Sequence, residues 1–454
     1  MFYSLVTFFC LFLSINLFSD TPIVVHLATE SQLLPLYLSP IQNQESGFPV
    51  DYLKKLEDVL KFDLNFNGMT TVVKPSKEML QLDQTTPFQA PDRLVQWQKF
   101  PVYYVVKCQV SKGTLSAKLL LINQNSVKSV DGISLTGLFA EDRRKIHLLA
   151  DLIFKTLFNQ SGIAQTRLLY TLKQKDSKTD KSISAVIEAD YDGGNSQAIT
   201  DDKALCVTPC YFPPKPGHLS RSFAYVSYKS GQPKIYFRSI EDKQTTRFTL
   251  LKGNQFMPAF SPSRDQIAFV CDVAGNPDLF IQRLDPETGP VGKPLQLFTS
   301  RFGTQASPTF NPDGSKLAFV SNKDGSPRIY ILKVPKEENV KNLQATLLTK
   351  QNRENTAPNW SPDGKKIAYS ALTKGVRQIW VYDFDRGKEE QITDGPFHKE
   401  NPCFAPNSLH IAFNSSQEDG QSDIYIINLN HKKAIKITSG KGEKRFPSWE
   451  SRKR

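Results

Sequence analysis

Alternating apolar and polar residues recur in phase through the second half of the chain. Four copies of one phrase carry the pattern: MPAFSPSRDQIAF at 257–269, SPTFNPDGSKLAF at 307–319, APNWSPDGKKIAY at 357–369 and NPCFAPNSLHIAF at 401–413. Weaker copies start at 208 and 446, so six prolines anchor the repeat, and they are 49, 50, 50, 44 and 45 residues apart: Pro209, Pro258, Pro308, Pro358, Pro402 and Pro447. A period in this range indicates a propeller or a solenoid.

Each repeat reads as four short strands. The anchor strand ends at a turn, which is Asp-Gly in the copies at 313–314 and 363–364, and this dipeptide is a strong hairpin signal. An apolar-Ala-aromatic strand follows, then an alternating strand such as RIYILKV (328–334), then a weaker one such as EEQIT (389–393). Four antiparallel strands in a unit of this length predict a propeller blade.

The two ends of the repeat region complete each other. FPSWE (446–450) is a first strand with only a few residues after it, whereas 166–172, 184–190 and 196–200 read as second, third and fourth strands without an anchor. Joining them gives a sixth blade and leaves no exposed sheet edge in the ring. We therefore expect a six-bladed propeller over residues 166–454, closed by the C-terminal strand.

Residues 20–165 follow a different pattern. IVVHL (23–27) predicts a strand, 49–62 carries apolar residues at helical spacing, and 101–110 with 114–122 predicts a hairpin. Asp142 is expected to cap a helix that ends before Gly162. The predicted fold is thus multi-domain: a small N-terminal mixed α/β domain (20–165) followed by the all-β propeller.

The first residues predict export. Leu5 to Phe18 form an uncharged, mostly apolar run, too short for a span that needs about 20 apolar residues. The run fits a secretory signal peptide over residues 1–19, although no Lys or Arg precedes it; the alternative is a buried N-terminal strand. We expect no membrane insertion of the mature chain.

Charge and cysteine usage restrict the chemistry. The 454 residues carry a formal charge of +12, and nearly all of it falls in 166–454, which has 42 Lys and Arg against 31 Asp and Glu. These cations are not clustered on one face together with aromatic residues, as they would be at a nucleic-acid site. We therefore expect no nucleic-acid partner, and we expect an acidic partner from the cell envelope. Cys206 and Cys210 could form a local disulfide, whereas Cys271 and Cys403 read as buried thiols.

Motifs for metals, cofactors and catalysis are lacking in the sequence. No Cys-x-x-Cys pair, P-loop, Gly-x-Gly-x-x-Gly or Gly-x-Ser-x-Gly motif occurs, so no metal, cofactor or catalytic residue is expected. Asp190-Tyr-Asp192 with Asp201 resembles a calcium loop only weakly, and a tight turn between strands is the favoured interpretation.

The chain resembles the TolB family, the soluble periplasmic components of the Tol-Pal envelope system of Gram-negative bacteria. The resemblance is carried by the repeat P-x-[FW]-S-P-D-G-x-x-[IL]-A-[FY], by the join at 162–170 (GIAQTRLLY) and by the terminal RFPSW at 445–449. The pattern departs from the family at 264–265 and 407–408, where Asp-Gly is absent, and in the irregular first anchor.

This resemblance implies a monomeric adaptor that is not an enzyme and that maintains outer-membrane integrity and envelope constriction at division. The peptidoglycan-associated lipoprotein Pal would bind the loops that lead into the anchor strands: Asn254, Gln255, Met257, Gln305, Ala306, Ser307, Thr356, Ala357, Lys399, Asn401, Arg445 and Phe446. TolA would bind an N-terminal segment that contains Asp20, Thr21, Pro22, Ile23, Val24 and Val25. Other outer-membrane proteins form a further class of partner.

Two alternatives remain open. The protein could be an envelope propeller that binds an acidic glycan or a small ligand in its channel. The positive charge of the propeller is the reason for considering this alternative. A peptidase-type propeller carries the same repeat, but such enzymes place a hydrolase domain after the propeller, and too few residues follow the last anchor here.

Overall fold

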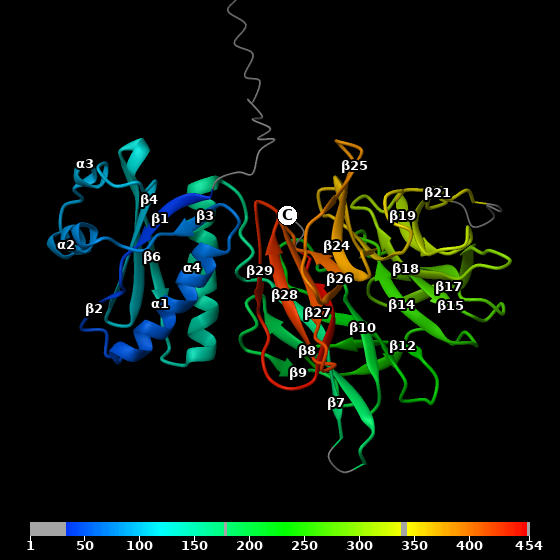
Figure 1. The fold of residues 1–454 in the computed structure, drawn as a ribbon. Coiled ribbons are helices and arrows are strands. Elements are labelled where there is room, and N and C mark those ends of the chain that lie inside the picture. The colour runs from blue at the N-terminus through cyan, green and yellow to red at the C-terminus, as the bar shows by residue number, and fades with distance from the viewer. Residues whose placement is uncertain (1–32, 177–178, 337–342, 452–454) are drawn as a thin grey trace, which may run out of the picture. The chain divides into compact units, whose positions relative to one another are not determined.

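A computed structural model describes residues 33–176, 179–336 and 343–451. The signal segment (1–19), the strand expected at 23–27 and the TolA segment Asp20 to Val25 lie outside the described residues. Figure 1 draws the α/β region in blue to cyan and the strands that follow it in green to red.

The α/β region is built on a six-stranded mixed sheet. Its main path runs β3-β1-β4-β5-β6, with β2 paired to β4. The strands are β1 (Leu34–Leu38), β2 (Gln42–Gln44), β3 (Thr70–Val72), β4 (Tyr104–Ser111), β5 (Thr114–Leu121) and β6 (Ser126–Ser134). The helices are α1 (Val50–Asn65), α2 (Lys77–Thr85), α3 (Leu94–Trp97), the 3₁₀ turn η1 (Ile122–Gln124) and α4 (Phe139–Phe158). The helix expected at 49–62 and the β4–β5 hairpin are confirmed.

The start of α4 corrects one prediction. Asp142 does not cap the helix, because α4 begins three residues earlier, at Phe139. Its buried carboxylate lies in the first turn and reaches back to accept hydrogen bonds from the backbone N–H groups of Thr136 (2.8 Å) and Gly137 (2.9 Å). A carboxylate there also interacts favourably with the helix dipole. Among the described residues, no helix combines the length and apolarity needed to cross a membrane.

Four separate four-stranded antiparallel sheets make up the middle of the propeller. They are β10-β11-β12-β13, β14-β15-β16-β17, β18-β19-β20-β21 and β22-β23-β24-β25. The strand bounds are β10 (Cys206–Tyr211), β11 (Ser222–Ser227), β12 (Lys234–Ser239), β13 (Thr245–Arg247), β14 (Gln255–Phe260), β15 (Gln266–Cys271), β16 (Asp278–Asp285), β17 (Gly289–Phe298), β18 (Gln305–Phe310), β19 (Lys316–Ser321), β20 (Arg328–Lys333), β21 (Thr346–Leu347), β22 (Asn355–Trp360), β23 (Lys366–Thr373), β24 (Val376–Asp383) and β25 (Lys388–Gln391).

The remaining eight strands form one sheet, not the two separate blades expected. Its strands are β7 (Arg167–Lys175), β8 (Ser182–Asp190), β9 (Gln197–Ala198), β26 (His398–Phe404), β27 (His410–Ser416), β28 (Ser422–Asn428), β29 (His431–Lys436) and β30 (Glu443–Trp449). The two halves join where Ser422 of β28 pairs with Glu443 of β30. As predicted, the C-terminal strand pairs antiparallel with β7.

Burial explains why the second strand of each repeat carries the apolar-Ala-aromatic pattern. The five alanines of these strands are fully buried between neighbouring sheets, where a larger side chain would not fit: Ala224, Ala268, Ala318, Ala368 and Ala412. The turn before each strand needs a left-handed residue. Gly314 and Gly364 supply it in two repeats, and Arg264 (φ 70°) and Ser408 (φ 57°) adopt it where the Asp-Gly signal is missing.

The disulfide between Cys206 and Cys210 is not formed, and both thiols are free. The two residues lie on the same strand, β10, rather than in a loop. Four residues of strand span roughly 13 Å, well beyond the roughly 7 Å between Cα atoms that a disulfide can bridge. Cys271 is buried as expected, and Cys403 is half-buried.

Candidate functional site

The innermost strand of every four-strand repeat contains a β-bulge at the same place. In β14, for example, Phe256 pairs with Val270 and Ala259 with Ala268, so β14 has one residue more than its partner. The same shift occurs in β10, β18, β22, β26 and β30. Each bulge contains an anchor proline, which has no N–H to give to the ladder and is tolerated at a bulge for that reason.

The residue before each anchor proline has a left-handed backbone. Six non-glycine residues share this feature, with φ between 46° and 57°: Thr208, Met257, Ser307, Ala357, Asn401 and Phe446. We call them the ring residues. Left-handed backbone at a non-glycine residue costs about 1–2 kcal/mol, and strain of this kind is concentrated at functional sites. Its repetition at six equivalent positions therefore points to this ring as the candidate site.

All six ring residues line a central cavity of about 450 Å³. The remaining lining residues are mainly prolines, small polar residues and one aromatic residue from each anchor strand: Tyr211, Phe260, Phe310, Trp360, Phe404 and Trp449. No charged side chain is among the described residues that line the cavity. The cavity can therefore receive an apolar or uncharged polar group, but it offers no cation for an acidic ligand.

Side chains connect neighbouring anchor strands around this cavity. The residue between the anchor proline and the aromatic residue accepts a hydrogen bond from the next strand: Asn359 Oδ1 from Phe404 N (2.8 Å) and Thr309 Oγ1 from Trp360 N (3.3 Å). Ser448 Oγ accepts in the same way from Tyr211 N (3.4 Å) and so connects the C-terminal strand to β10. These bonds hold the ring residues at fixed separations.

The residues predicted for partner binding divide into two groups. Met257, Ser307, Ala357, Asn401 and Phe446 line the cavity. The others lie outside its lining, and Gln255 and Gln305 are almost completely buried. Sequence reasoning missed Thr208, the sixth ring residue, although its position before Pro209 is equivalent to that of the others.

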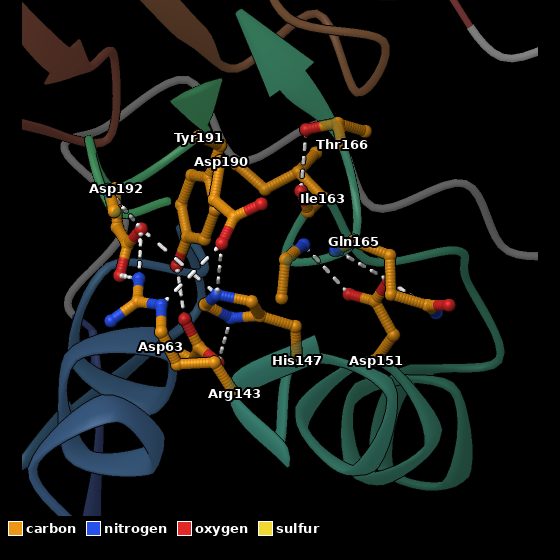
Figure 2. Close-up of polar contacts among 12 residues, drawn as sticks. Asp63, Arg143, His147, Asp151, Ile163, Gln165, Thr166, Asp190, Tyr191 and Asp192 are labelled. Carbon is orange, nitrogen blue, oxygen red and sulfur yellow. Dashed lines mark hydrogen bonds and ion pairs between the residues drawn. The ribbon is translucent and has the colours of Figure 1, made fainter. Parts of the chain in front are cut away.

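A cluster of polar side chains, separate from the ring residues, connects the α/β region to the propeller (Figure 2). His147 of α4 has its Nδ1 2.8 Å from Asp63 Oδ2 of α1, and Tyr191 OH donates to Asp63 Oδ1 at 2.8 Å. Arg143, one turn before His147, places Nη2 2.5 Å from Asp192 Oδ2 and Nε 3.4 Å from Asp190 Oδ2. The segment at 190–192 is thus the tight turn that the sequence favoured, and its carboxylates pair with α4.

Burial perturbs the proton affinities in this cluster. It raises the pKa of Asp63 to about 6, because the carboxylate is fully enclosed. Burial is the largest single influence on the pKa of His147 and lowers it, but the carboxylates of Asp63, Asp192 and Asp190 together raise it, and the net shift is upward. The two groups are therefore coupled, and the protonation of one affects that of the other.

His147, Asp190 and Asp192 offer three ligand atoms within 4.8 Å of one another, a spacing that could hold a metal ion. The guanidinium group of Arg143 already pairs with both carboxylates. A metal ion would have to displace this cation, so we assign no metal to the cluster. The spacing of Arg143, His147 and Asp151 along one helix face was a signal that the sequence analysis did not use.

These features define a class: a β-propeller with an N-terminal α/β region and an uncharged central cavity ringed by strained residues. The TolB β-propeller domain family matches residues 154–453. A TolB homolog from Protochlamydia amoebophila is 49% identical over 385 residues, which is 84% of this chain and 82% of the relative. One from Chlamydia pneumoniae is 38% identical over 452 residues, 98% and 95% of the two chains.

The solved structure of TolB from Acinetobacter baumannii has the same fold, with a TM-score of 0.74 at 21% identity over 93% of this chain and 97% of that one. The chain belongs to the TolB family, as the sequence resemblance predicted.

Proposed function

We propose that this chain is a monomeric periplasmic adaptor of the Tol-Pal system with no catalytic activity. Pal would bind the propeller at the central cavity, TolA would bind the N-terminal segment, and the contacts would support outer-membrane integrity and constriction at division. Residues 1–19 would be the export signal, 20–165 the α/β domain and 166–454 the propeller. Counting the eight-stranded sheet as two blades gives six blades.

The observation that carries this proposal is the ring of six left-handed, non-glycine residues around an uncharged cavity. Because the six residues line one cavity, a partner loop that enters it with uncharged side chains would meet residues from every repeat. The alternative of an acidic glycan in the channel is less well supported, because no cation lines the cavity among the described residues.

In vivo crosslinking of the full chain tests the proposal. The wild-type protein is expected to capture a peptidoglycan-binding outer-membrane lipoprotein, and the double variant Met257→Asp/Phe446→Asp is expected to lose it. Asp tolerates left-handed backbone better than most residues, so these changes should leave the fold intact. Val291→Asp/Val50→Asp, at exposed positions on β17 and α1, makes the same change of net charge and is the matched control.

Circular dichroism and urea unfolding should give the same fold and stability for both variants. Failure of the wild type to capture any such lipoprotein, or retention of the lipoprotein by the double variant, would contradict the proposal.

A further inference from the structure

The two most exposed large apolar side chains among the described residues lie on equivalent loops of the propeller. Leu250 is 85% exposed and Phe302 is 87% exposed. Leu250 precedes β14 and Phe302 precedes β18, so each loop leads into an anchor strand and its ring residue. Apolar groups this exposed have no role in the core, which suggests a role at the surface.

A hairpin joins these two loops into one surface. The turn at 272–277 contacts the first loop, because Asp272 Oδ1 accepts a hydrogen bond from Asn254 N at 2.6 Å. It contacts the second loop through Asn276 Nδ2, which donates to the carbonyl oxygen of Arg301 at 3.4 Å. Val273, 41% exposed, lies on this hairpin. We call Leu250, Val273 and Phe302 the apolar strip.

Exposed cations that form no ion pair with any described residue accompany the strip on successive loops. Five of them have no ion pair among the described residues: Lys252, Arg301, Lys350, Arg353 and Lys374. Of the carboxylates nearby, Asp324 pairs with Lys323 at 2.9 Å and Glu354 with Arg377 at 3.3 Å. Glu389 accepts a hydrogen bond from Lys350 N at 2.8 Å and another from Tyr369 OH. We call these five cations the basic arc.

Backbone hydrogen bonds place the basic arc on the same face as the strip. Asn322 N donates to Thr304 O at 3.4 Å, and Asn355 N donates to Pro327 O at 2.8 Å, so the loops from 299 to 354 are continuous through the hairpin at 322–327. Leu372 N donates to Glu354 O at 3.0 Å and adds the turn that carries Lys374.

We propose that the basic arc and the apolar strip together bind an acidic protein segment that carries one aromatic or aliphatic side chain. The apolar side chain would pack on a member of the apolar strip, and the carboxylates would pair with the flanking cations. This inference rests on the proposed function, because four of the five arc cations lie on loops that lead into strands lining the cavity. It adds the chemistry of the partner and the side of the face that it contacts. The cations of the arc would repel basic partners, which gives specificity, and would attract acidic partners from a distance, which speeds association.

The same face argues against an anionic membrane as the occupant. The loops of the following repeat carry the exposed carboxylates Asp394, Glu418 and Asp419. An extended anionic surface that covered the arc would also approach these carboxylates and be repelled. A narrow acidic segment can follow the arc without meeting them.

The test uses a fluorescein-labelled peptide, Asp-Glu-Asp-Phe-Glu-Asp-Glu, and the full mature chain in fluorescence anisotropy. Wild type is expected to bind with an affinity that falls as salt rises. Lys252→Glu/Arg301→Glu is expected to weaken binding at least tenfold, and Phe302→Ser several-fold. Lys74→Glu/Lys77→Glu makes the same change of net charge at exposed positions near α2 and should stay within twofold of wild type.

A peptide with Ala in place of Phe should bind several-fold more weakly, and one with Lys in place of every acid should not bind. Equal loss of binding in the control variant, or binding of wild type to vesicles with 30% phosphatidylglycerol that the arc variant loses, would overturn the inference. Lipoprotein capture separates the two proposals: an arc variant that still captures the lipoprotein refutes the arc alone, whereas a wild type that captures none refutes the proposed function.

Discussion

Replacing Arg143 by Met should weaken the contact between the α/β region and the propeller and so lower the free energy of unfolding. Its guanidinium group lies between two buried carboxylates, and the side chains of Arg143, Asp190 and Asp192 are 11%, 8% and 7% exposed. Arg143→Met keeps the apolar stem of the side chain and removes only the charge. The carboxylates then remain in a site from which water is largely excluded.

The expected cost follows from that burial. Breaking a buried ion pair by removing one partner costs about 3–5 kcal/mol, because the remaining charge is uncompensated. His147 Nε2 lies 3.8 Å from Asp190 Oδ2 and 3.9 Å from Asp192 Oδ1, so a protonated imidazole can compensate in part. Because the imidazole carries less charge at pH 7.5 than in acid, we expect a loss of about 3–5 kcal/mol at pH 7.5 and a smaller loss at lower pH.

Urea unfolding followed by tryptophan fluorescence measures this loss. Trp97 reports on the α/β region, and Trp449, whose Nε1 donates to Thr166 Oγ1 at 2.8 Å, reports on the propeller near α4. The triple variant Arg143→Met/Asp190→Asn/Asp192→Asn should recover most of the lost free energy of unfolding, because it leaves neither of these buried carboxylates without a counter-charge. Lys54→Met removes an exposed pair with Glu57 and should cost less than about 1 kcal/mol.

Two results would refute this reasoning. A loss below about 1 kcal/mol in Arg143→Met would mean that the carboxylates are solvated or protonated without cost. A triple variant no more stable than the single one would mean that packing of the guanidinium group, rather than its charge, was the stabilising contribution.

Three further predictions concern single sites. Burial lowers the pKa of His410 to about 4, so between that pH and about 6.5 the folded state binds fewer protons than the unfolded state. The free energy of unfolding should therefore decrease as the pH falls through this window. In a series of urea unfolding curves at different pH, His410→Asn should remove that part of the pH dependence. Glu450 is fully buried and 2.7 Å from Arg167, so Glu450→Ala should cost about 3 kcal/mol, and an unchanged midpoint in urea would contradict this. A Cβ on Gly193 would lie 1.7 Å from a backbone oxygen, so Gly193→Ala should unfold at much lower urea than Gly217→Ala, which has a similar left-handed φ and open space around it.

Local pattern was sufficient to predict most of the elements. The spacing of the anchor prolines and the period-two alternation located the strands, because a strand of a propeller blade must bury one set of side chains whatever its neighbours are. The helices α1 and α4 followed from apolar residues at helical spacing. The pairing of β30 with β7 could also be predicted, since each end of the repeat lacked what the other end supplied.

The errors occurred where local signals competed. A disulfide between Cys206 and Cys210 was expected from their close spacing, but the anchor pattern that includes Pro209 puts both on a strand, which is too extended for a disulfide. Asp142 resembled a cap, but it accepts hydrogen bonds from the loop before the helix while lying inside it. The anchor pattern was sufficient to exclude the disulfide, whereas the role of Asp142 depends on the path of the loop before α4, which residue type and spacing do not give.

The sequence by itself determined that this protein is a repeat of four-stranded units after a small α/β region, because hydrophobic periodicity acts through near neighbours along the chain. Only the tertiary structure brought Asp63, Arg143 and Asp192 together, since they lie on elements far apart in sequence and meet where the α/β region packs on the propeller. The strain at the ring residues was likewise invisible in the sequence. Each left-handed residue lies in a bulge that becomes visible only when the anchor strand is paired with its neighbour, and only the complete propeller brings the six residues to one cavity.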